Sequence, residues 1–233
     1  MKIAIMQPYF MPYIGYFQLI NAVDKFVIYD NIKYTKKGWI NRNRILVNGK
    51  DQYISLPLKK DSDYLNINER VLSDSWGNER RKLLNKLKAS YAKSPFYSSV
   101  IILLEDILNH SEKNLFNFIE NSIKIINTYL DIKTKIIFSS QIKINHSLCS
   151  ENKIMAICKE LRSDIYVNPI GGQSLYTKDF FKKDSIKLLF LKTDDIVYNQ
   201  FDNHFAPFLS IIDVLMFNSK ENTKKLLNSY NFF

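Results

Sequence analysis

Residues 2–17 read Lys-Ile-Ala-Ile-Met-Gln-Pro-Tyr-Phe-Met-Pro-Tyr-Ile-Gly-Tyr-Phe, and this stretch sets the expected fold. The apolar run over residues 2–6 predicts a buried strand that ends at Gln7 and Pro8, because proline has no backbone N–H to give to a sheet. Residues 16–23 predict a short helix, and residues 25–29 predict a second strand. This order is typical of a βαβ unit in a parallel sheet, and ligands of such sheets bind beyond the carboxyl ends of the strands.

The rest of the chain favours an α/β fold whose mainly parallel sheet begins with this βαβ unit. The dipeptide Asn48-Gly49 lies between strand-like runs at 44–48 and 52–56 and predicts a β-hairpin. The middle is helix-rich at about residues 76–129, and these helices can form a subdomain at about 76–130 within one domain that spans residues 1–233. We expect helices at 76–91, 96–109, 113–129, 150–161 and 207–217, and strands at 134–139, 164–167 and 186–192.

Composition narrows the class of protein. The chain has 233 residues, of which 46% are hydrophobic, so it can bury a substantial core. It has no stretch of 18 apolar residues that would span a membrane and no signal peptide. Cys149 and Cys158 are its two cysteines, which suggests reduced thiols in a cytoplasmic protein and no zinc site. The net charge of +10 permits an anionic ligand, although scattered lysines are usually a solvated surface.

The first candidate site combines the loop after the first strand with the end of the second strand. Tyr9, Tyr13 and Tyr16, held by Pro12 near Gly15, can form a rigid aromatic wall with hydroxyl donors, which suits a base or a sugar. We expect Gln7 and Asp30 to act as catalytic or polar groups there, with Asp30 as a proton acceptor. The alternative is that these residues only pack and cap a tight turn.

The second candidate is the segment Trp39-Ile40-Asn41-Arg42-Asn43-Arg44. On an extended chain Arg42 and Arg44 point to one face and Asn41 and Asn43 to the other. An arginine pair is well matched to phosphate or carboxylate. The alternative is an ordinary charged loop.

The third candidate is Gly171-Gly172 with Tyr176, which follows the predicted strand at 164–167. Backbone N–H groups at a glycine pair can cradle an anion, although the pattern of a phosphate-binding P-loop is absent and most glycine pairs are simple turns.

The fourth candidate is the C-terminal stretch that contains His204 and Asp213. His204 can serve as a general base because histidine titrates near neutral pH, although a lone histidine among aromatic residues is more often structural. Asp213 lies on an apolar helix face, where an unpaired carboxylate is costly. We therefore expect Asp213 to have a specific partner, with an arginine of the second candidate as our choice. The sequence contains no serine-hydrolase elbow, zinc-protease motif or kinase motifs, and its three histidines lack metal-ligand spacing.

Together these segments resemble the WbqC-like family. The resemblance rests on the N-terminal Gln-Pro-Tyr-Phe-Met-Pro-Tyr-Ile-Gly-Tyr-Phe stretch, the strand to Asp30, the segment 39–44, Gly171-Gly172 with Tyr176, and Phe-Leu-Ser-Ile-Ile-Asp at 208–213. It implies a bacterial protein of surface-polysaccharide or O-antigen gene clusters. It further implies the transfer of an acyl or aminoacyl group, such as glycyl, to an amino sugar on a nucleotide.

Three functions stay open at this point. The first is a transferase in which Asp30 or His204 takes a proton, Arg42 and Arg44 hold the diphosphate, and the tyrosines wall the sugar. The second is an ATP-dependent, nucleotide-activating enzyme, and the third is a non-catalytic binding protein of polysaccharide assembly. No cofactor is evident. The partner is a nucleotide-linked sugar, an aminoacyl-tRNA is one candidate donor, and the sequence defines neither the donor nor the oligomeric state.

Overall fold

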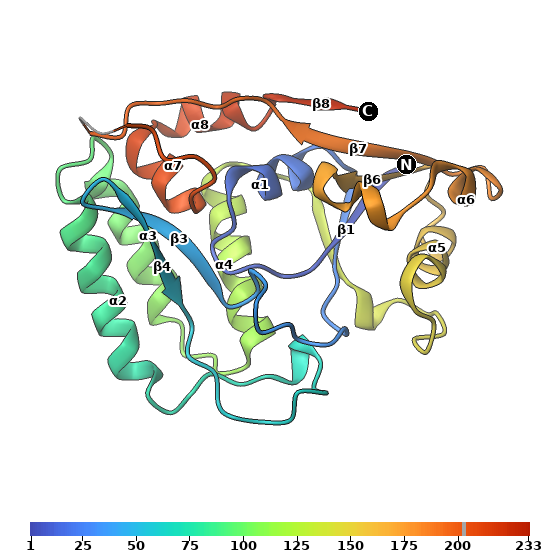
Figure 1. Ribbon diagram of the computed structural model, residues 1–233, viewed down its shortest axis with the longest axis horizontal. Coiled ribbons are helices and arrows are strands. Elements are labelled where there is room, and N and C mark those ends of the chain that lie inside the picture. Colours follow the sequence, from blue (N-terminus) through green and yellow to red (C-terminus); the bar gives the residue numbers. More distant parts are fainter. Residues whose placement is uncertain (202–203) are drawn as a thin grey trace.

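The computed structural model describes residues 1–201 and 204–233. Its main sheet has strand order β5-β2-β1-β6-β7-β8, with neighbouring strands parallel except β8, which runs antiparallel to β7. The expected α/β fold with a mainly parallel sheet is therefore confirmed, and β1 and β2 are the predicted parallel pair (Figure 1). The strand bounds are β1 (Lys2–Met6), β2 (Lys25–Ile28), β5 (Lys135–Phe138), β6 (Ile165–Pro169), β7 (Lys187–Thr193) and β8 (Tyr230–Phe232).

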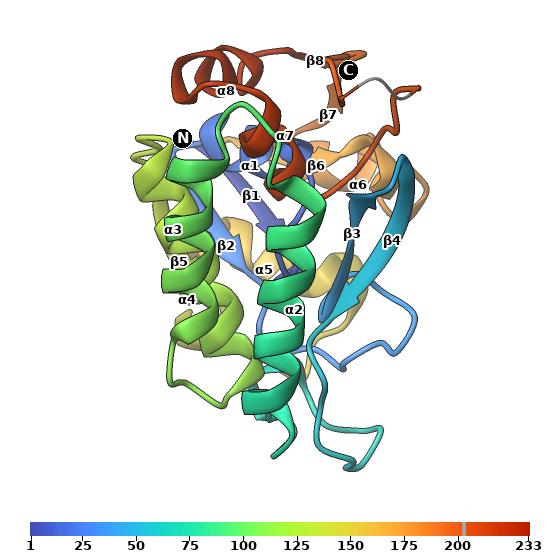
Figure 2. The ribbon, with the colours of Figure 1, turned by 90° about the vertical axis from the view of Figure 1, so that its left-hand side faces the viewer.

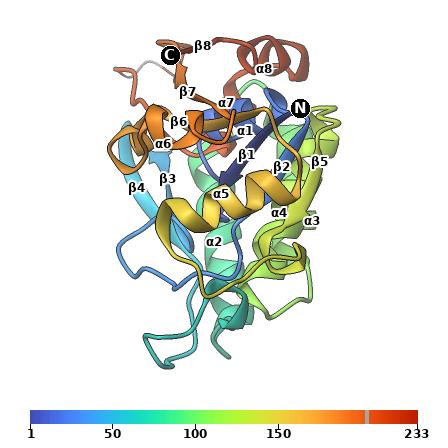
Figure 3. The ribbon, with the colours of Figure 1, turned by 90° about the vertical axis from the view of Figure 1, so that its right-hand side faces the viewer.

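Alternation along the strands gives the sheet two buried faces. Ile3, Ile5 and Val27 pack toward α5 (Ser150–Glu160) and α6 (Lys178–Lys182), which cover one face (Figure 3). Ala4 and Phe26 belong to the larger core on the other face. That core also contains buried residues of the remaining helices: α1 (Ile14–Asn21), α2 (Trp76–Tyr91), α3 (Tyr97–Asn109), α4 (Leu115–Tyr129), α7 (Ile211–Phe217) and the end of α8 (Lys220–Leu226).

The predicted hairpin is formed by β3 (Arg42–Val47) and β4 (Lys50–Ser55), which lie beside α2 (Figure 2). Asn48 and Gly49 form a two-residue loop with φ values of 49° and 75°. Positive φ at both positions is the type I′ geometry that matches strand twist, which is why Asn-Gly appears here. The hairpin strands begin and end one or two residues earlier than we predicted.

The strand order changes direction at β1. Helix α1 joins β1 to β2 on one face of the sheet, whereas α5 joins β5 to β6 on the opposite face. Because consecutive connections leave on opposite faces, the carboxyl ends of β1 and β6 border a crevice, which is where open α/β sheets bind ligands. The residues that follow these two strands are Gln7 and Ile170.

The largest departure from the predicted elements is at the predicted helix 207–217. Its helix, α7, begins only at Ile211, because Phe208 has φ of 56° and Ser210 caps the first turn by accepting a hydrogen bond from the Ile212 N–H. The predicted Gly171-Gly172 turn lies within a short 3-10 helix, Ile170–Leu175. Two further 3-10 helices are Ile67–Glu69 and Ser139–Gln141. No described helix combines the length and apolarity needed to cross a membrane.

We expect Gln18 to be a strong contributor to stability. Its side chain is fully buried on α1, donates to the carbonyls of Leu226 at 2.8 Å and Ser229 at 3.0 Å, and accepts from the Thr193 hydroxyl at 2.7 Å. Gln18→Ala leaves these groups unpaired and should lower the free energy of unfolding by about 2–3 kcal/mol in urea titrations. The matched control, Gln52→Ala on exposed β4, should change it by less than about 0.5 kcal/mol. Equal losses in the two variants would contradict this account.

Candidate functional site

The loop after β1 is fastened to the segment that leads into β3. The Phe10 N–H donates to the Ile40 carbonyl at 3.0 Å. The buried Asn43 amide donates to the carbonyls of Phe10 at 3.1 Å and Met11 at 2.8 Å. These bonds hold Met11 at φ of 45°, a conformation that a side chain of this size adopts only when its surroundings enforce it.

The start of α7 is also hydrogen-bonded to this loop. The Ser210 hydroxyl donates to the Met11 carbonyl at 2.7 Å, and the Ile211 N–H donates to the Pro12 carbonyl at 2.8 Å. The Ser210 N–H donates to the Arg44 carbonyl at 2.8 Å. The N-terminal loop, the start of β3 and the start of α7 therefore meet at one place.

The three tyrosines of the loop have different positions. Tyr16 is buried, and its hydroxyl donates to the Gln7 carbonyl at 3.0 Å, so it supports the loop from inside. The Tyr9 ring lies 5.8 Å from the Tyr16 ring, centroid to centroid. Burial, with a smaller contribution from Tyr13, raises the pKa of Tyr9 to about 12. The Tyr9 hydroxyl is therefore a hydrogen-bond donor at neutral pH and no base.

Gly15 has a definite steric role beneath Tyr13. A Cβ atom on Gly15 would lie 2.3 Å from Cε2 and 2.5 Å from the hydroxyl of Tyr13. The Tyr13 ring thus folds back over the first turn of α1, and its side chain reaches Thr193 at the end of β7. Burial raises the pKa of Tyr13, and the hydrogen bond with Thr193 partly offsets this. Gly15 thus leaves room for the close approach of the protein's own Tyr13 ring.

A cavity of about 160 Å³, which we call the aromatic pocket, opens beside this loop. Arg44 stands at its edge, where Nη1 binds the Asp51 carboxylate at 2.7 Å and Nη2 approaches the Phe208 carbonyl at 3.5 Å. Within the described part of the chain the buried Nε of Arg44 has no hydrogen-bond partner. The pocket is lined by Tyr9, Pro12, Tyr13, Trp39, Asn43, Arg44 and Phe208.

The two arginines of the second candidate lie against one aromatic surface, as their alternation predicted. The guanidinium carbon of Arg42 is 6.0 Å from the Trp39 ring centroid and 5.0 Å from that of Tyr53, and the carbon of Arg44 is 5.7 Å from the Trp39 centroid. Trp39 and Tyr53 stack at 6.1 Å. Arg42 is tied to the carbonyls of Gly38 and Lys37, so it braces the wall, whereas Arg44 borders the pocket.

A larger cavity of about 660 Å³, which we call the β7 cleft, begins at the carboxyl end of β7. Tyr13 and Phe208 line both this cleft and the aromatic pocket. Its polar lining residues are consecutive: Lys192, Thr193, Asp194 and Asp195. We did not single these residues out in the sequence. They begin at the last residue of the predicted strand 186–192 and continue beyond it, so the strand-end rule that selected Asp30 could have found them.

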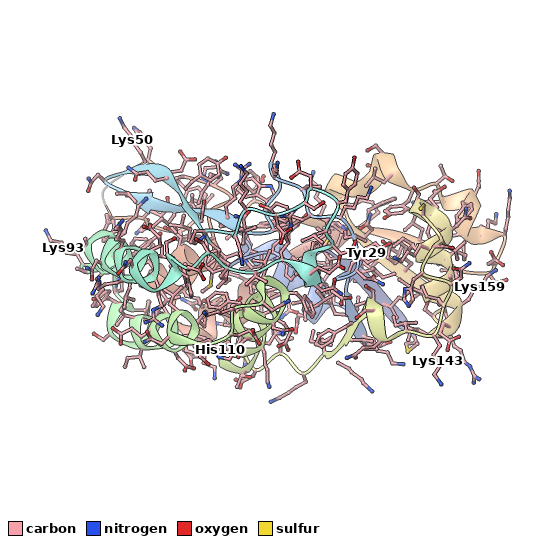
Figure 4. All side chains as sticks on the ribbon, turned by 90° about the horizontal axis from the view of Figure 1, so that it is seen from below. Tyr29, Lys50, Lys93, His110, Lys143 and Lys159 are labelled. Carbon is pink, nitrogen blue, oxygen red and sulfur yellow. The ribbon has the colours of Figure 1, made fainter. Side chains whose placement is uncertain are left out.

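Asp30 lies buried just beyond the end of β2. It directly follows Tyr29, which Figure 4 labels in a view from below. Its carboxylate accepts hydrogen bonds from the Ser139 hydroxyl at 2.8 Å, the Ser140 N–H at 2.9 Å and the Asn68 amide at 2.9 Å. These bonds tie the end of β2 to the end of β5. A proton-transfer role for Asp30 stays a prediction.

Our expectation that Asp213 pairs with an arginine was wrong. Its fully buried carboxylate accepts from the hydroxyls of Tyr91 at 2.9 Å and Tyr198 at 2.7 Å, and from the Gln200 amide at 2.6 Å. Arg44 instead forms an ion pair with the half-exposed Asp51. Burial raises the pKa of Asp213, and its bonds to Tyr198, Gln200 and Tyr91 partly offset this.

The third candidate lies on the other side of the sheet. Tyr176 packs edge-on against Tyr166 at 5.7 Å, in the core that α5 and α6 cover. A Cβ atom on Gly172 would lie 2.3 Å from Nδ2 of Asn168, so the asparagine fills the space beside this glycine, whereas Gly171 has no atom that close. Tyr176 therefore does not join the tyrosines of the N-terminal loop.

Two other predicted residues take separate positions. His204 is exposed in the loop before α7. Asn41 accepts from the Tyr34 hydroxyl and donates to the Leu56 carbonyl, both at 2.8 Å, so it holds neighbouring loops together. Among residues 1–201 and 204–233, no group of three metal-ligating side chains gathers.

A family model described as the WbqC-like protein family matches residues 7–225, which include all three segments that meet at the loop. The chain belongs to the WbqC-like protein family. It is also similar to an uncharacterized protein of Mycobacterium tuberculosis, with 28% identity over 218 residues and coverage of 92% of each chain. No solved structure matches the chain.

We expect that Gly15→Ala does not stabilise the protein, although alanine normally stabilises a helix relative to glycine. Alanine favours a helix over glycine by up to about 1 kcal/mol, but here its Cβ displaces the Tyr13 ring. The control is Gly77→Ala on α2, where a Cβ meets nothing within 4 Å. Urea unfolding should show Gly77→Ala stabilised and Gly15→Ala unchanged or destabilised. An equal gain in both variants would show that Tyr13 does not depend on Gly15.

We expect the buried Asp213 to give the stability a specific pH dependence. Its pKa is raised in the folded state above about 3.9 for an unfolded chain. The stabilisation from its protonated form is full below about pH 3.9 and is lost as the pH rises through the folded pKa. Over that range the free energy of unfolding of the wild type should fall relative to Asp213→Asn, which cannot titrate.

Urea titrations at a series of pH values measure this difference. Gln52→Ala, at an exposed position on β4, is the control; it removes no titratable group and should keep a constant difference from the wild type. A constant difference for Asp213→Asn as well would contradict the raised pKa. Asp213→Ala, which leaves Tyr91, Tyr198 and Gln200 facing an empty space, should lose about 2–4 kcal/mol.

Proposed function

We propose that this protein is a cytoplasmic transferase that modifies an amino sugar on a nucleotide, by N-acyl or aminoacyl transfer, for a surface polysaccharide such as O-antigen. One observation carries the proposal. A small aromatic pocket with an arginine adjoins a larger cleft with two carboxylates, and the two cavities share Tyr13 and Phe208. A ligand with a phosphate at one end and an amine at the other can place the phosphate at Arg44, which also pairs with Asp51, and the amine at Asp194 and Asp195, which lie beside Lys192.

The aromatic pocket suits the nucleotide end of such a ligand. Rings of Tyr9, Trp39 and Phe208 offer faces on which a base or a sugar ring can stack. Arg44 offers a fixed cation, and its guanidinium is well matched to a phosphate. Because the Tyr9 hydroxyl remains protonated at neutral pH, it can also donate to a phosphate or a sugar oxygen.

The carboxyl end of β7 suits the amine end. Asp194 accepts from the Asn231 amide at 2.7 Å, whereas Asp195 is exposed at the cleft and free to face a ligand's amine. In the reaction the amine nitrogen attacks the donor's carbonyl carbon, the N–C bond forms, and the leaving group departs. Asp195 accepts the proton that the nitrogen loses. Asp30 and His204 remain alternative proton acceptors.

Membership of the WbqC-like family supports this function through the segments concerned. The loop of residues 7–13, the start of β3 and the start of α7 lie within the matched range, and they build the wall between the cavities. A shared family of proteins is consistent with a shared site at this place.

The test is calorimetric binding of UDP- and dTDP-linked amino sugars. We expect binding to the wild type and a loss of about ten- to a hundredfold in affinity for Arg44→Ala, because a charge-assisted hydrogen bond to phosphate is removed. Arg81→Ala, an exposed arginine on α2, is the matched control and should bind as the wild type does.

Equal binding by wild type and Arg44→Ala would remove the nucleotide from the aromatic pocket, and no binding of any sugar nucleotide by the wild type would overturn the proposal. Binding without turnover, in the presence of every donor class, would favour the non-catalytic alternative.

A further inference from the structure

The β7 cleft is polar at one end and apolar over the rest of its lining. Apart from the four consecutive polar residues at the end of β7, its lining side chains are aliphatic or aromatic. The cleft thus has one polar end, at residues 192–195, and an apolar remainder. A glycyl group carries only a few atoms and a charge, so it would leave most of this apolar wall facing water.

The apolar part of the cleft is preformed. Leu191, Leu209 and Val214 line it and are 2%, 3% and 3% exposed, because each also belongs to the main hydrophobic core. A cleft backed by packed core residues does not need to reorganise to receive a ligand, which lowers the entropic cost of binding.

The rim of the cleft exposes apolar side chains. Val197 is 72% exposed and Phe208 is 69% exposed. Phe208 also has φ of 56°, an unfavourable conformation for an aromatic residue, and the Ser210 bonds beside it hold the chain there. Apolar groups gathered around a concave site indicate a ligand that covers them.

We propose that the β7 cleft binds the hydrocarbon chain of an acyl group, and that this group is delivered as an acyl thioester. This inference rests on the proposed function and names its donor. The volume of about 660 Å³ lies in the range of roughly 300–1,000 Å³ usual for ligand sites, so it can hold a chain of several methylenes. The carbonyl carbon sits at the polar end, next to Tyr13, where the sugar amine arrives from the aromatic pocket.

The chemical step balances without an added oxidant or reductant. The amine nitrogen attacks the thioester carbonyl carbon, an N–C bond forms, and the C–S bond breaks. The thiol leaves with the proton that Asp195 has taken from the nitrogen. The products are an N-acyl sugar nucleotide and a free thiol.

The experiment is calorimetry with coenzyme A and its acetyl, butyryl, hexanoyl and octanoyl thioesters. Each buried methylene should strengthen binding by about fourfold until the cleft is full. Val214→Phe, which fills the base of the cleft, should shorten the series. Val197→Ser changes an exposed rim residue, spares the core, and should reduce the gain per methylene. The control is Ile102→Ser, a residue on α3 that is 67% exposed and does not line the cleft, which should leave the series unchanged.

The outcomes separate this inference from the proposed function. A flat series in the wild type, with amino-sugar nucleotide binding intact, would overturn the acyl chain and leave the transferase. Tight binding of a glycyl-tRNA with a steep salt dependence, and no gain per methylene, would likewise overturn it in favour of an aminoacyl donor. A clear chain-length dependence without sugar-nucleotide binding would sustain the acyl site and remove the proposed acceptor.

Discussion

Three carbonyl groups in the loop after β1 constrain the site more than any other feature. Pro8 and Pro12 prevent a regular strand or helix there, so the carbonyls of Phe10, Met11 and Pro12 need partners from elsewhere. A buried carbonyl without a partner costs about 1–3 kcal/mol. The Asn43 amide, the Ser210 hydroxyl and the Ile211 N–H supply the partners. The hydrogen bonds that satisfy these carbonyls thus bring β3 and α7 into contact with the loop. The two elements are about 170 residues apart in the chain.

A second polar network makes this arrangement stiff. The Tyr91 hydroxyl accepts from the Leu46 N–H at 2.9 Å and donates to Asp213 at 2.9 Å. It therefore joins β3, α2 and α7, while Tyr198 and Gln200 attach the loop that leads into α7 to the same carboxylate. These groups are buried, except the half-buried Tyr198, and they are satisfied together, so the network fastens β3, α2 and α7 to one another. A fixed wall is what a reaction between two bound substrates requires.

Local patterns predicted the elements well, and long-range contacts explain what they missed. The run at residues 2–6, the helix at 76–91 and the Asn48-Gly49 turn each depend on neighbouring residues, and each is found where the pattern placed it. The partner of Asp213 is a different matter, since Tyr91 lies 122 residues away and no local signal links the two. The start of α7 was missed for a similar reason, because Phe208 is held in a left-handed conformation by contacts with β3 and not by its own propensity.

The site follows the same division. The strand-end rule placed Gln7 and Asp30 just beyond β1 and β2, where the structure has them, but the aromatic pocket depends on which face of the sheet each later residue occupies. Tyr176 lies on the α5 face, and Asn168 fills the space beside Gly172. These predicted site residues therefore pack among the protein's own side chains. On the opposite side the Tyr13 ring can fold over Gly15 and leave space at the end of β7. The space at the end of β7 reaches Asp194 and Asp195, so the polar end and the apolar wall form one cleft. This cleft shares Tyr13 with the pocket that Arg44 lines.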